Sequence, residues 1–434
     1  MSKRTASRRH FLAASLGLGG ALLAPRVLGK SLPELLPPAG TRRVLIVGGG
    51  WGGLSAARRL RQLAPELELV LIERQAVFRS LPLSNKWLVG RTDDALPPQD
   101  YARTAQAFGY RVIHAEVTAI DREQRRVHTA QETLGYDWLI LAAGIDYDYA
   151  PWLGDDARAI EATRRLYPAG FMAAELDALK RKLAAFKGGE LLLTVPPGPS
   201  RCPPAPYERA VMIAWWLKTR GIKGRLVLVD AGGGMQRFNR IFAERYRDQV
   251  LHLTHAAVKS LDPFRKVFVT EFDELKFDDA IIIAPQQANA LVRQAGLSEP
   301  AANGKPGAWA AFDPLHLHAI GDERVFLIGD LLGKASPLFG HYPKSAHMAA
   351  QLGRIAAAEI ADRALDKLPE PQLPESVCHV YTDAEPMEML RIDAAYRRRG
   401  DGLIAQTVRQ HEDPQPRGED VQWARSLHTE MLAF

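Results

Sequence analysis

The stretch Arg43-Val44-Leu45-Ile46-Val47-Gly48-Gly49-Gly50-Trp51-Gly52-Gly53 joins an apolar run to a G-x-G-x-x-G pattern. Such a run ahead of a glycine turn predicts a buried strand, and a helix is expected from about Gly52 to Leu63. A second apolar run, Leu67–Ile72, ends at the acidic residue Glu73. Strand, helix and strand in this order predict a βαβ unit whose glycine pattern is placed to bind a dinucleotide.

The glycines and the acidic residue of this unit have separate expected roles. Gly48 permits the tight turn, Gly50 lets the backbone approach a pyrophosphate, and Gly53 allows close packing of the helix on the strand. The N-terminus of the expected helix offers unpaired N–H groups and a partial positive charge to phosphates. Glu73 is expected to accept hydrogen bonds from the hydroxyls of the adenosine ribose.

Two later segments resemble parts of flavoproteins that have two dinucleotide-binding domains. Tyr136–Gly144 is similar to the strand and turn that close the FAD domain, and Val325–Asp330 is similar to a late strand whose aspartate lies beside the ribityl chain and pyrophosphate. We therefore expect FAD rather than NAD in this half. The candidate cofactor-binding residues are Gly48, Gly50, Trp51, Gly53, Glu73, Arg74, Val117, Ala143, Gly144, Gly329, Asp330 and Lys344.

The second expected nucleotide-binding domain, around residues 191–204, lacks an equivalent glycine pattern. The expected strand Leu191–Val195 is followed by the proline-rich segment Pro196–Pro204. Prolines have no N–H to donate, so this turn is not expected to hold a pyrophosphate, and a nicotinamide substrate is not expected. The apolar runs that recur with helical stretches between them predict an α/β fold with two Rossmann-like domains and a smaller C-terminal domain.

Composition excludes several classes of function. The chain has 434 residues, 47% hydrophobic and 24% charged, which is typical of a soluble globular protein. The net charge of +6 comes without a dense basic stripe and interleaved aromatics, so nucleic-acid binding is not expected. Only two cysteines, Cys202 and Cys378, are present; they exclude a zinc site with several thiolates, no metal site is expected, and one disulfide is allowed.

The N-terminus predicts export. Ser7-Arg8-Arg9-His10-Phe11-Leu12 precedes an apolar stretch, Phe11–Ala24, and twin arginines before a short apolar segment mark the Tat route. The stretch is shorter than the roughly 20 residues of a membrane span, so no stable span is expected. We assign residues 1–30 to a Tat signal peptide and expect the mature protein in the periplasm.

Three further segments resemble the flavin-binding subunit of flavocytochrome c sulfide dehydrogenase: Arg201–Arg209, Tyr342–Ala346 and Val377–Tyr381. The resemblance implies that Cys202 and Cys378 form a redox-active disulfide beside the flavin, and that Glu208 lies close to it as a proton shuttle. It also implies oxidation of a small sulfur substrate such as sulfide. The electrons would pass to a c-type cytochrome subunit, because this chain has no C-x-x-C-H haem motif. Lys344 could set a positive charge near the flavin.

One departure from this family concerns how FAD is attached. Some members bind it through a cysteine in the loop after the second strand, but here that loop, Phe78–Asn85, has none. We therefore expect noncovalent FAD. The expected domains are residues 41–155 with 297–367 for FAD, 156–296 for a second Rossmann-like domain with a degenerate NAD site, and 368–434 for a C-terminal flavocytochrome-type domain.

Two other functions stay open at this stage. One is a sulfide:quinone oxidoreductase at the membrane surface, because Val421–Leu432 has apolar residues at helical spacing, although a helix that faces the core explains that spacing equally. The other is a non-catalytic FAD-containing assembly or sensor protein that has kept the fold.

Overall fold

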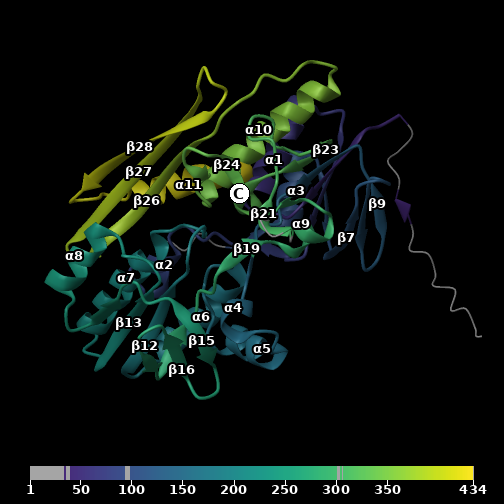
Figure 1. Cartoon of the computed structure of the whole chain (residues 1–434). Coiled ribbons are helices and arrows are strands. Elements are labelled where there is room, and N and C mark those ends of the chain that lie inside the picture. Colours follow the sequence, from purple (N-terminus) through teal and green to yellow (C-terminus); the bar gives the residue numbers. More distant parts are fainter. Residues whose placement is uncertain (1–33, 36–39, 93–97, 301–303, 305, 434) are drawn as a thin grey trace, which may run out of the picture.

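The N-terminal βαβ unit lies in a six-stranded sheet with the order β22-β23-β10-β2-β3-β6 (Figure 1). Five neighbouring strands run parallel and β22 pairs antiparallel with β23. The computed structural model describes residues 34–35, 40–92, 98–300, 304 and 306–433, so the expected export signal lies outside the described residues. The strands are β2 (Arg43–Val47), β3 (Glu68–Glu73), β6 (Arg111–His114), β10 (Trp138–Leu141), β22 (His318–Ala319) and β23 (Asp322–Leu327).

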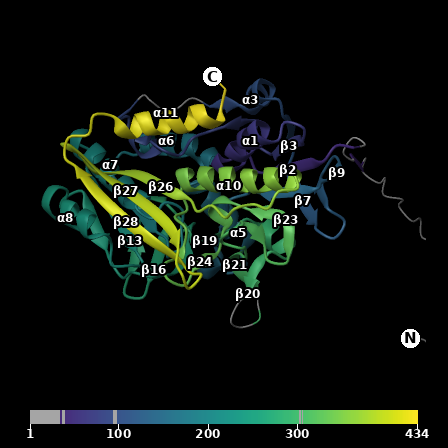
Figure 2. The same ribbon diagram turned by 90° about the horizontal axis from the view of Figure 1, so that it is seen from above.

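Two helices pack closely beside this sheet, α1 (Trp51–Leu63) and α10 (Ala346–Ala364) (Figure 2). A Cβ atom on Gly353 of α10 would overlap the carbonyl oxygen of Gly52 on α1, so glycine is required where the two helices meet. Ser345 caps α10, because its side chain accepts the Met348 N–H. This helix pair brings the start of α10 beside the glycine turn.

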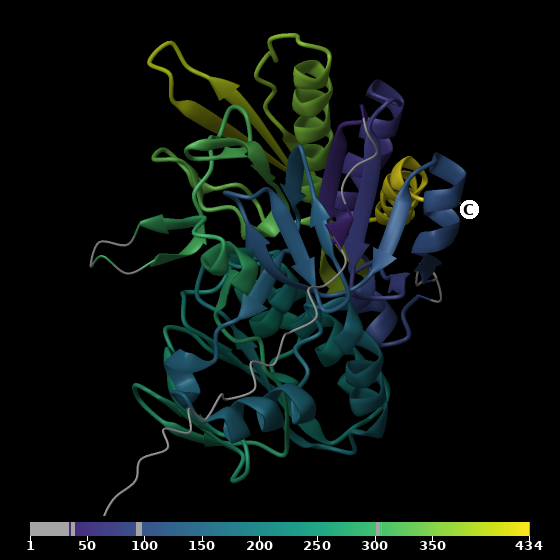
Figure 3. The same ribbon diagram turned by 90° about the vertical axis from the view of Figure 1, so that its right-hand side faces the viewer.

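A second sheet, parallel throughout, has the order β14-β13-β12-β18. It lies apart from the first sheet and has its own buried core (Figure 3). Helix α7 (Ala205–Thr219) follows the proline-rich turn, and α8 (Gln236–Arg245) follows β13. The strands are β12 (Gly189–Val195), β13 (Gly224–Asp230), β14 (Val250–Leu253) and β18 (Asp279–Ile281).

The C-terminal segment forms a three-stranded antiparallel sheet of β26 (Glu375–Ala384), β27 (Met387–Arg398) and β28 (Ile404–Asp413). Strand β26 contacts both α7 and α10, so it lies across the two halves (Figure 1). Helix α11 (Glu419–Met431) returns to contact α1 and buries Leu427 and Met431 in the core of the FAD-binding half. Its apolar residues therefore face the protein interior.

The α/β fold with two Rossmann-like sheets is confirmed. The strand expected at Arg43–Val47 has those bounds, and the second expected strand, Leu67–Ile72, is displaced by one residue as β3. The expected fold class did not include the strands of the C-terminal sheet. The exact domain boundaries stay a prediction.

Candidate functional site

The glycine turn has the geometry that a dinucleotide requires. Gly48 has φ +104, and a Cβ there would lie 2.5 Å from the carbonyl oxygen of Ala142. A Cβ on Gly53 would overlap the carbonyl oxygen of Gly48. A Cβ on Gly50, in contrast, would have no protein atom within 4 Å. Gly48 and Gly53 therefore shape the turn, and Gly50 leaves its outer side open to a ligand.

The acid at the end of β3 holds the turn in place. The Glu73 carboxylate accepts the Gly49 N–H at 2.7 Å and the Gln75 N–H at 2.8 Å. The buried hydroxyl of Tyr101, on α3 (Tyr101–Phe108), donates to the Gly49 carbonyl at 2.9 Å. The glycine turn, Glu73 and Tyr101 are thus joined by hydrogen bonds. Tyr101 was not among the residues expected from the sequence.

These residues line a cavity of about 370 Å³. Most of the residues expected from sequence contribute to its wall: Gly48, Gly50, Trp51, Glu73, Arg74, Ala143, Gly144, Cys202, Glu208, Gly329, Asp330 and Cys378. The structure thus brings together segments from the FAD-binding half, the start of α7 and strand β26.

Three expected residues do not line the cavity. Gly53 faces the Gly48 carbonyl within the turn. Val117 lies on β7 (Val117–Asp121), in a separate antiparallel sheet. Lys344 is buried, where its Nζ donates to the carbonyl oxygens of Asp330 at 2.8 Å and Leu332 at 2.7 Å. Its role is therefore to hold the Asp330 loop, and burial lowers the pKa of this amine to about 7.

Asp330 lies at the wall of the cavity. Its Oδ2 accepts the Arg201 Nε–H at 2.6 Å, whereas its buried Oδ1 has no hydrogen-bond partner among the described residues. Buried acceptors are normally satisfied, so this oxygen fits a hydroxyl donor of a ligand such as the ribityl chain of FAD. Arg201 was not among the site residues expected from the sequence. Its backbone N–H also donates to the side-chain oxygen of Gln286 at 2.7 Å.

The two cysteines meet at the cavity wall. Cys202 lies in the turn before α7 with φ +44, and its N–H donates to the Lys344 carbonyl at 2.8 Å. Cys378 lies on β26, and both cysteines are free and line the cavity. The neighbouring Cys378 thiol, burial and the nearby negative charge of Glu208 raise the pKa of the Cys202 thiol well above its usual value.

Glu208 lies in the first turn of α7, close to this thiol pair. Its carboxylate accepts the Tyr381 N–H at 2.9 Å and the Asn85 side-chain amide at 2.5 Å. Burial raises the pKa of Glu208 above its usual range, although these two hydrogen bonds act in the opposite direction. A carboxyl group with a raised pKa is suited to exchange protons near neutral pH.

A buried ion pair adjoins Glu208. The Lys86 ammonium lies 2.6 Å from the Asp420 carboxylate, and both side chains are almost fully buried. The Tyr381 hydroxyl donates to Asp420 at 2.8 Å and accepts from Lys86 at 3.1 Å. This network joins α2 (Ser84–Leu88), β26 and α11 around the cavity. No motif in the sequence indicated it.

The edge of the second sheet is arranged differently from that of the first. Asp230, at the end of β13, accepts hydrogen bonds from the Tyr207 hydroxyl at 2.7 Å and the Gly232 N–H at 2.7 Å. The His252 ring nitrogen lies 3.1 Å from the same carboxylate. Asp230 thus has two side chains as partners besides a backbone N–H, whereas the two protein donors to Glu73 are backbone N–H groups. The absence of a nicotinamide nucleotide at this edge stays a prediction.

The fold and this site define a FAD-dependent oxidoreductase with two dinucleotide-binding domains. The family described as pyridine nucleotide-disulphide oxidoreductase matches residues 42–182, and the central part of the flavocytochrome c sulfide dehydrogenase flavoprotein chain matches residues 176–285. The chain belongs to the flavoprotein family of flavocytochrome c sulfide dehydrogenases. FAD is its cofactor.

Individual relatives agree with this assignment. The chain is 48% identical over 46 residues to the flavoprotein chain of sulfide dehydrogenase (flavocytochrome c) from Chlorobaculum thiosulfatiphilum, covering 11% of this chain and 96% of that sequence. It is 27% identical over 244 residues to sulfide-quinone reductase from Aquifex aeolicus, covering 52% of this chain and about half, 54%, of the relative.

Solved structures show the same fold. The sulfide:quinone oxidoreductase of Aquifex aeolicus superimposes with a TM-score of 0.72 at 19% identity, covering 90% of this chain and 92% of that one. The covalent putidaredoxin reductase–putidaredoxin complex superimposes with a TM-score of 0.62 at 17% identity, covering 90% and 93%.

In the part of the chain that the structure describes, no group of His, Cys, Asp and Glu is arranged to hold a metal ion.

Proposed function

We propose that this chain is a periplasmic dehydrogenase that oxidises sulfide through a Cys202–Cys378 disulfide and passes the electrons to a c-type cytochrome subunit. The observation that carries this proposal is that Cys202 and Cys378 are neighbours at the wall of the cavity that the glycine turn lines. Two sulfurs in contact can interconvert between dithiol and disulfide. Membership in a sulfide-oxidising flavoprotein family supports the substrate class.

The protein's part in the reaction is thiol–disulfide exchange. Hydrosulfide attacks one sulfur of the disulfide, which gives a persulfide on one cysteine and a thiolate on the other. Glu208, beside the pair, takes the persulfide proton. When the disulfide forms again, one zero-valent sulfur and two electrons leave, so that hydrosulfide has become sulfur, one proton and two electrons. FAD supplies the acceptor for that electron pair.

Several residues of the cavity wall would hold FAD, each at a different part of the cofactor. The N-terminus of α1 and the open side of Gly50 suit the pyrophosphate, Glu73 suits the adenosine ribose, and the free oxygen of Asp330 suits a ribityl hydroxyl. The loop Phe78–Asn85 has no cysteine, so we propose noncovalent attachment. Acid precipitation tests it: the yellow colour is expected in the supernatant, and colour retained in the pellet would contradict it.

The acceptor and the location rest on sequence features. The twin arginines support export, and the absence of a C-x-x-C-H motif means that haem must come from a partner. We propose that residues 368–434 form part of the surface that meets this partner.

A quinone acceptor is the second candidate, because a sulfide-quinone reductase is among the relatives. Within the described ranges no helix has the length and hydropathy of a membrane span. A quinone enzyme acting at the membrane surface needs no such span, so only the acceptor test separates the two candidates.

Anaerobic titration of the purified protein with sulfide tests the function. The wild type is expected to lose its flavin absorbance with one equivalent of sulfide, and Cys202→Ser is expected to lose it at least about a hundredfold more slowly. Addition of cytochrome c or of a soluble quinone to the reduced protein then identifies the acceptor. If Cys202→Ser reacts at the wild-type rate, the disulfide mechanism is wrong. A flavin that no sulfur nucleophile reduces would indicate the non-catalytic assembly or sensor protein instead.

A further inference from the structure

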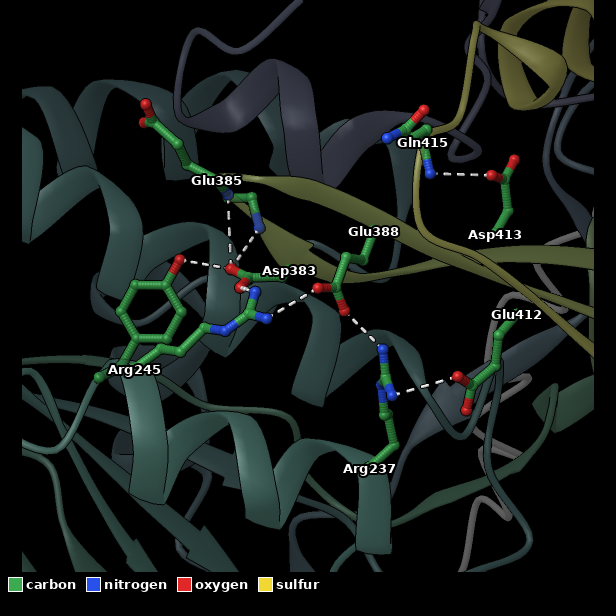
Figure 4. Close-up of polar contacts among 10 residues, drawn as sticks. Arg237, Arg245, Asp383, Glu385, Glu388, Glu412, Asp413 and Gln415 are labelled. Carbon is green, nitrogen blue, oxygen red and sulfur yellow. Dashed lines mark hydrogen bonds and ion pairs between the residues drawn. The ribbon is translucent and has the colours of Figure 1, made fainter.

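Strand β26 is fastened to the second Rossmann-like half by buried charges at the end that follows Cys378. Asp383 is fully buried and pairs with the Arg245 guanidinium at the C-terminus of α8. The neighbouring Tyr246 hydroxyl donates to Asp383 at 2.6 Å. Arg245 also donates to Glu388 on β27 at 2.8 Å. Figure 4 shows Arg245 between the two carboxylates.

A second arginine of the same helix extends this contact. Arg237 pairs with the other oxygen of Glu388 and donates to Glu412 on β28 at 3.3 Å (Figure 4). The group, here called the α8 clamp, therefore joins one helix to all three strands of the C-terminal sheet. Its members are Arg237, Arg245, Tyr246, Asp383, Glu388 and Glu412. Arginine suits this task because its planar group donates to two carboxylates at once.

The location of the clamp matters because the two cysteines belong to different parts of the molecule. Cys202 lies at the start of α7, on the second half, whereas Cys378 is held by the ladder between β26 and β27, opposite Ile392. A disulfide tolerates only a narrow range of separation, with Cα atoms usually about 4.4–6.8 Å apart. A shift of β26 against the second half would change that separation directly.

Asp383 lies on the same strand as Cys378, and Arg245 lies on the same half as Cys202. Within the clamp, Asp383 also accepts the Ala384 N–H at 2.7 Å, which fixes the end of β26. We propose that Arg245 is a positioning residue, and that its pairing with Asp383 sets the dithiol–disulfide equilibrium of Cys202 and Cys378. This inference rests on the proposed disulfide.

The physical effect is one of effective concentration. Holding the strand fixes one thiol against the other, which favours the disulfide over two mixed disulfides with an external thiol. A looser strand lowers this concentration and makes the disulfide easier to reduce. A clamp that only stabilises the fold would lower the melting temperature and leave the equilibrium unchanged.

The experiment is a redox titration of the full-length holoprotein in glutathione buffers, with the disulfide fraction measured by thiol labelling and mass spectrometry. Arg245→Gln is expected to reach half reduction at a value of [GSH]²/[GSSG] that is about tenfold lower, a shift of roughly 30 mV. Arg245→Lys, which keeps the charge, is expected to lie between this variant and the wild type. Arg247→Gln replaces an exposed neighbour whose side chain donates to the Ala243 carbonyl; it is the matched control and is expected to behave as the wild type.

The outcomes separate the two proposals. A wild-type protein that forms no disulfide at any ratio refutes the proposed function, and this inference with it. A wild-type disulfide whose equilibrium is the same in Arg245→Gln overturns the inference alone, even if the melting temperature falls. Should Arg245→Gln fail to fold, Glu388→Gln removes one contact of Arg245 and keeps the buried Asp383 paired. It is expected to shift the equilibrium in the same direction by a smaller factor, and an unshifted value in this variant also overturns the inference.

Discussion

The carboxylate of Glu208 accepts the backbone N–H of Tyr381 at 2.9 Å, although the two residues belong to different parts of the chain. Glu208 lies in the first turn of α7, a helix of the second half, and Tyr381 lies on the strand that carries Cys378. The proposed proton shuttle is therefore itself a link between the two segments that supply the cysteines. Its ionisation and the position of the strand depend on the same hydrogen bond.

Glu208→Gln is expected to slow reduction of the flavin by sulfide about a hundredfold, the lower end of the usual effect of a proton-transfer group. The amide keeps the shape of the side chain but cannot take a proton. Because burial raises the pKa of Glu208, the wild-type rate should fall as the pH drops through that pKa, and this limb should vanish in the variant. Stopped-flow measurements across pH test both points. Glu244→Gln, at an exposed position of α8, is the control, and an unchanged pH limb in Glu208→Gln would assign the proton transfer to another group.

Asp420→Asn is expected to lower the free energy of unfolding by about 3 kcal/mol, because it leaves the buried Lys86 ammonium without its counter-charge. Replacing both partners by apolar residues, Lys86→Met with Asp420→Leu, should recover much of this loss. Denaturant unfolding of Lys86→Met, Asp420→Leu and the double variant completes the cycle. Additive losses would show that the two charges are not energetically coupled.

Gly50→Ala and Gly53→Ala are expected to act in different ways. The new Cβ at Gly50 would have no protein atom within 4 Å, so this variant should fold with normal apoprotein stability and bind FAD poorly. The Cβ at Gly53 would overlap the Gly48 carbonyl, so that variant should be destabilised even without cofactor. The ratio of flavin to protein and the thermal unfolding of the apoprotein distinguish them. Full flavin content in Gly50→Ala would mean that the pyrophosphate lies elsewhere.

The buried His428 should make stability depend on pH. Its ring packs against Trp51 and Phe78, with centroids 5.1 and 5.7 Å away, and burial lowers its pKa to about 4. In the unfolded chain the pKa is about 6.5, so between these values the unfolded state binds the proton that the native state does not. Stability is therefore complete above about pH 6.5 and falls by about 3 kcal/mol as the pH decreases to about 4. His428→Phe should remove this part of the pH dependence of the free energy of unfolding, measured by denaturant unfolding at several pH values. If wild type and variant depend on pH in the same way, another group is responsible.

The sequence predicted the FAD-binding half well because its signals are local. The strand β2 and the glycine turn lie next to each other in the chain, and the strand is buried on both faces, which gives an uninterrupted apolar run. The long helix α10 has a local signal of the same kind, since its alanine-rich segment carries a capping serine at its start.

The C-terminal sheet escaped prediction because much of its outer strand, β28, meets water on both faces. Seven consecutive residues of β28, Thr407–Asp413, are exposed or only partly buried, so the strand carries no apolar run that could mark it. The ion pair of Lys86 and Asp420 was missed for a related reason. Charged residues far apart in a sequence are usually solvated, and only the folded arrangement shows that these two lie together in the interior.

The hydrogen bonds of Asp230 bear on how this scaffold could be redesigned. Rebuilding a glycine-rich turn in place of the prolines would not be enough to let nicotinamide nucleotides exchange electrons with the protein, because Tyr207 and His252 would still compete for the acid that a ribose needs. Both competitors would have to be removed as well. We therefore expect that no single substitution would give this protein a nicotinamide nucleotide site, because the turn and the acid would both have to change.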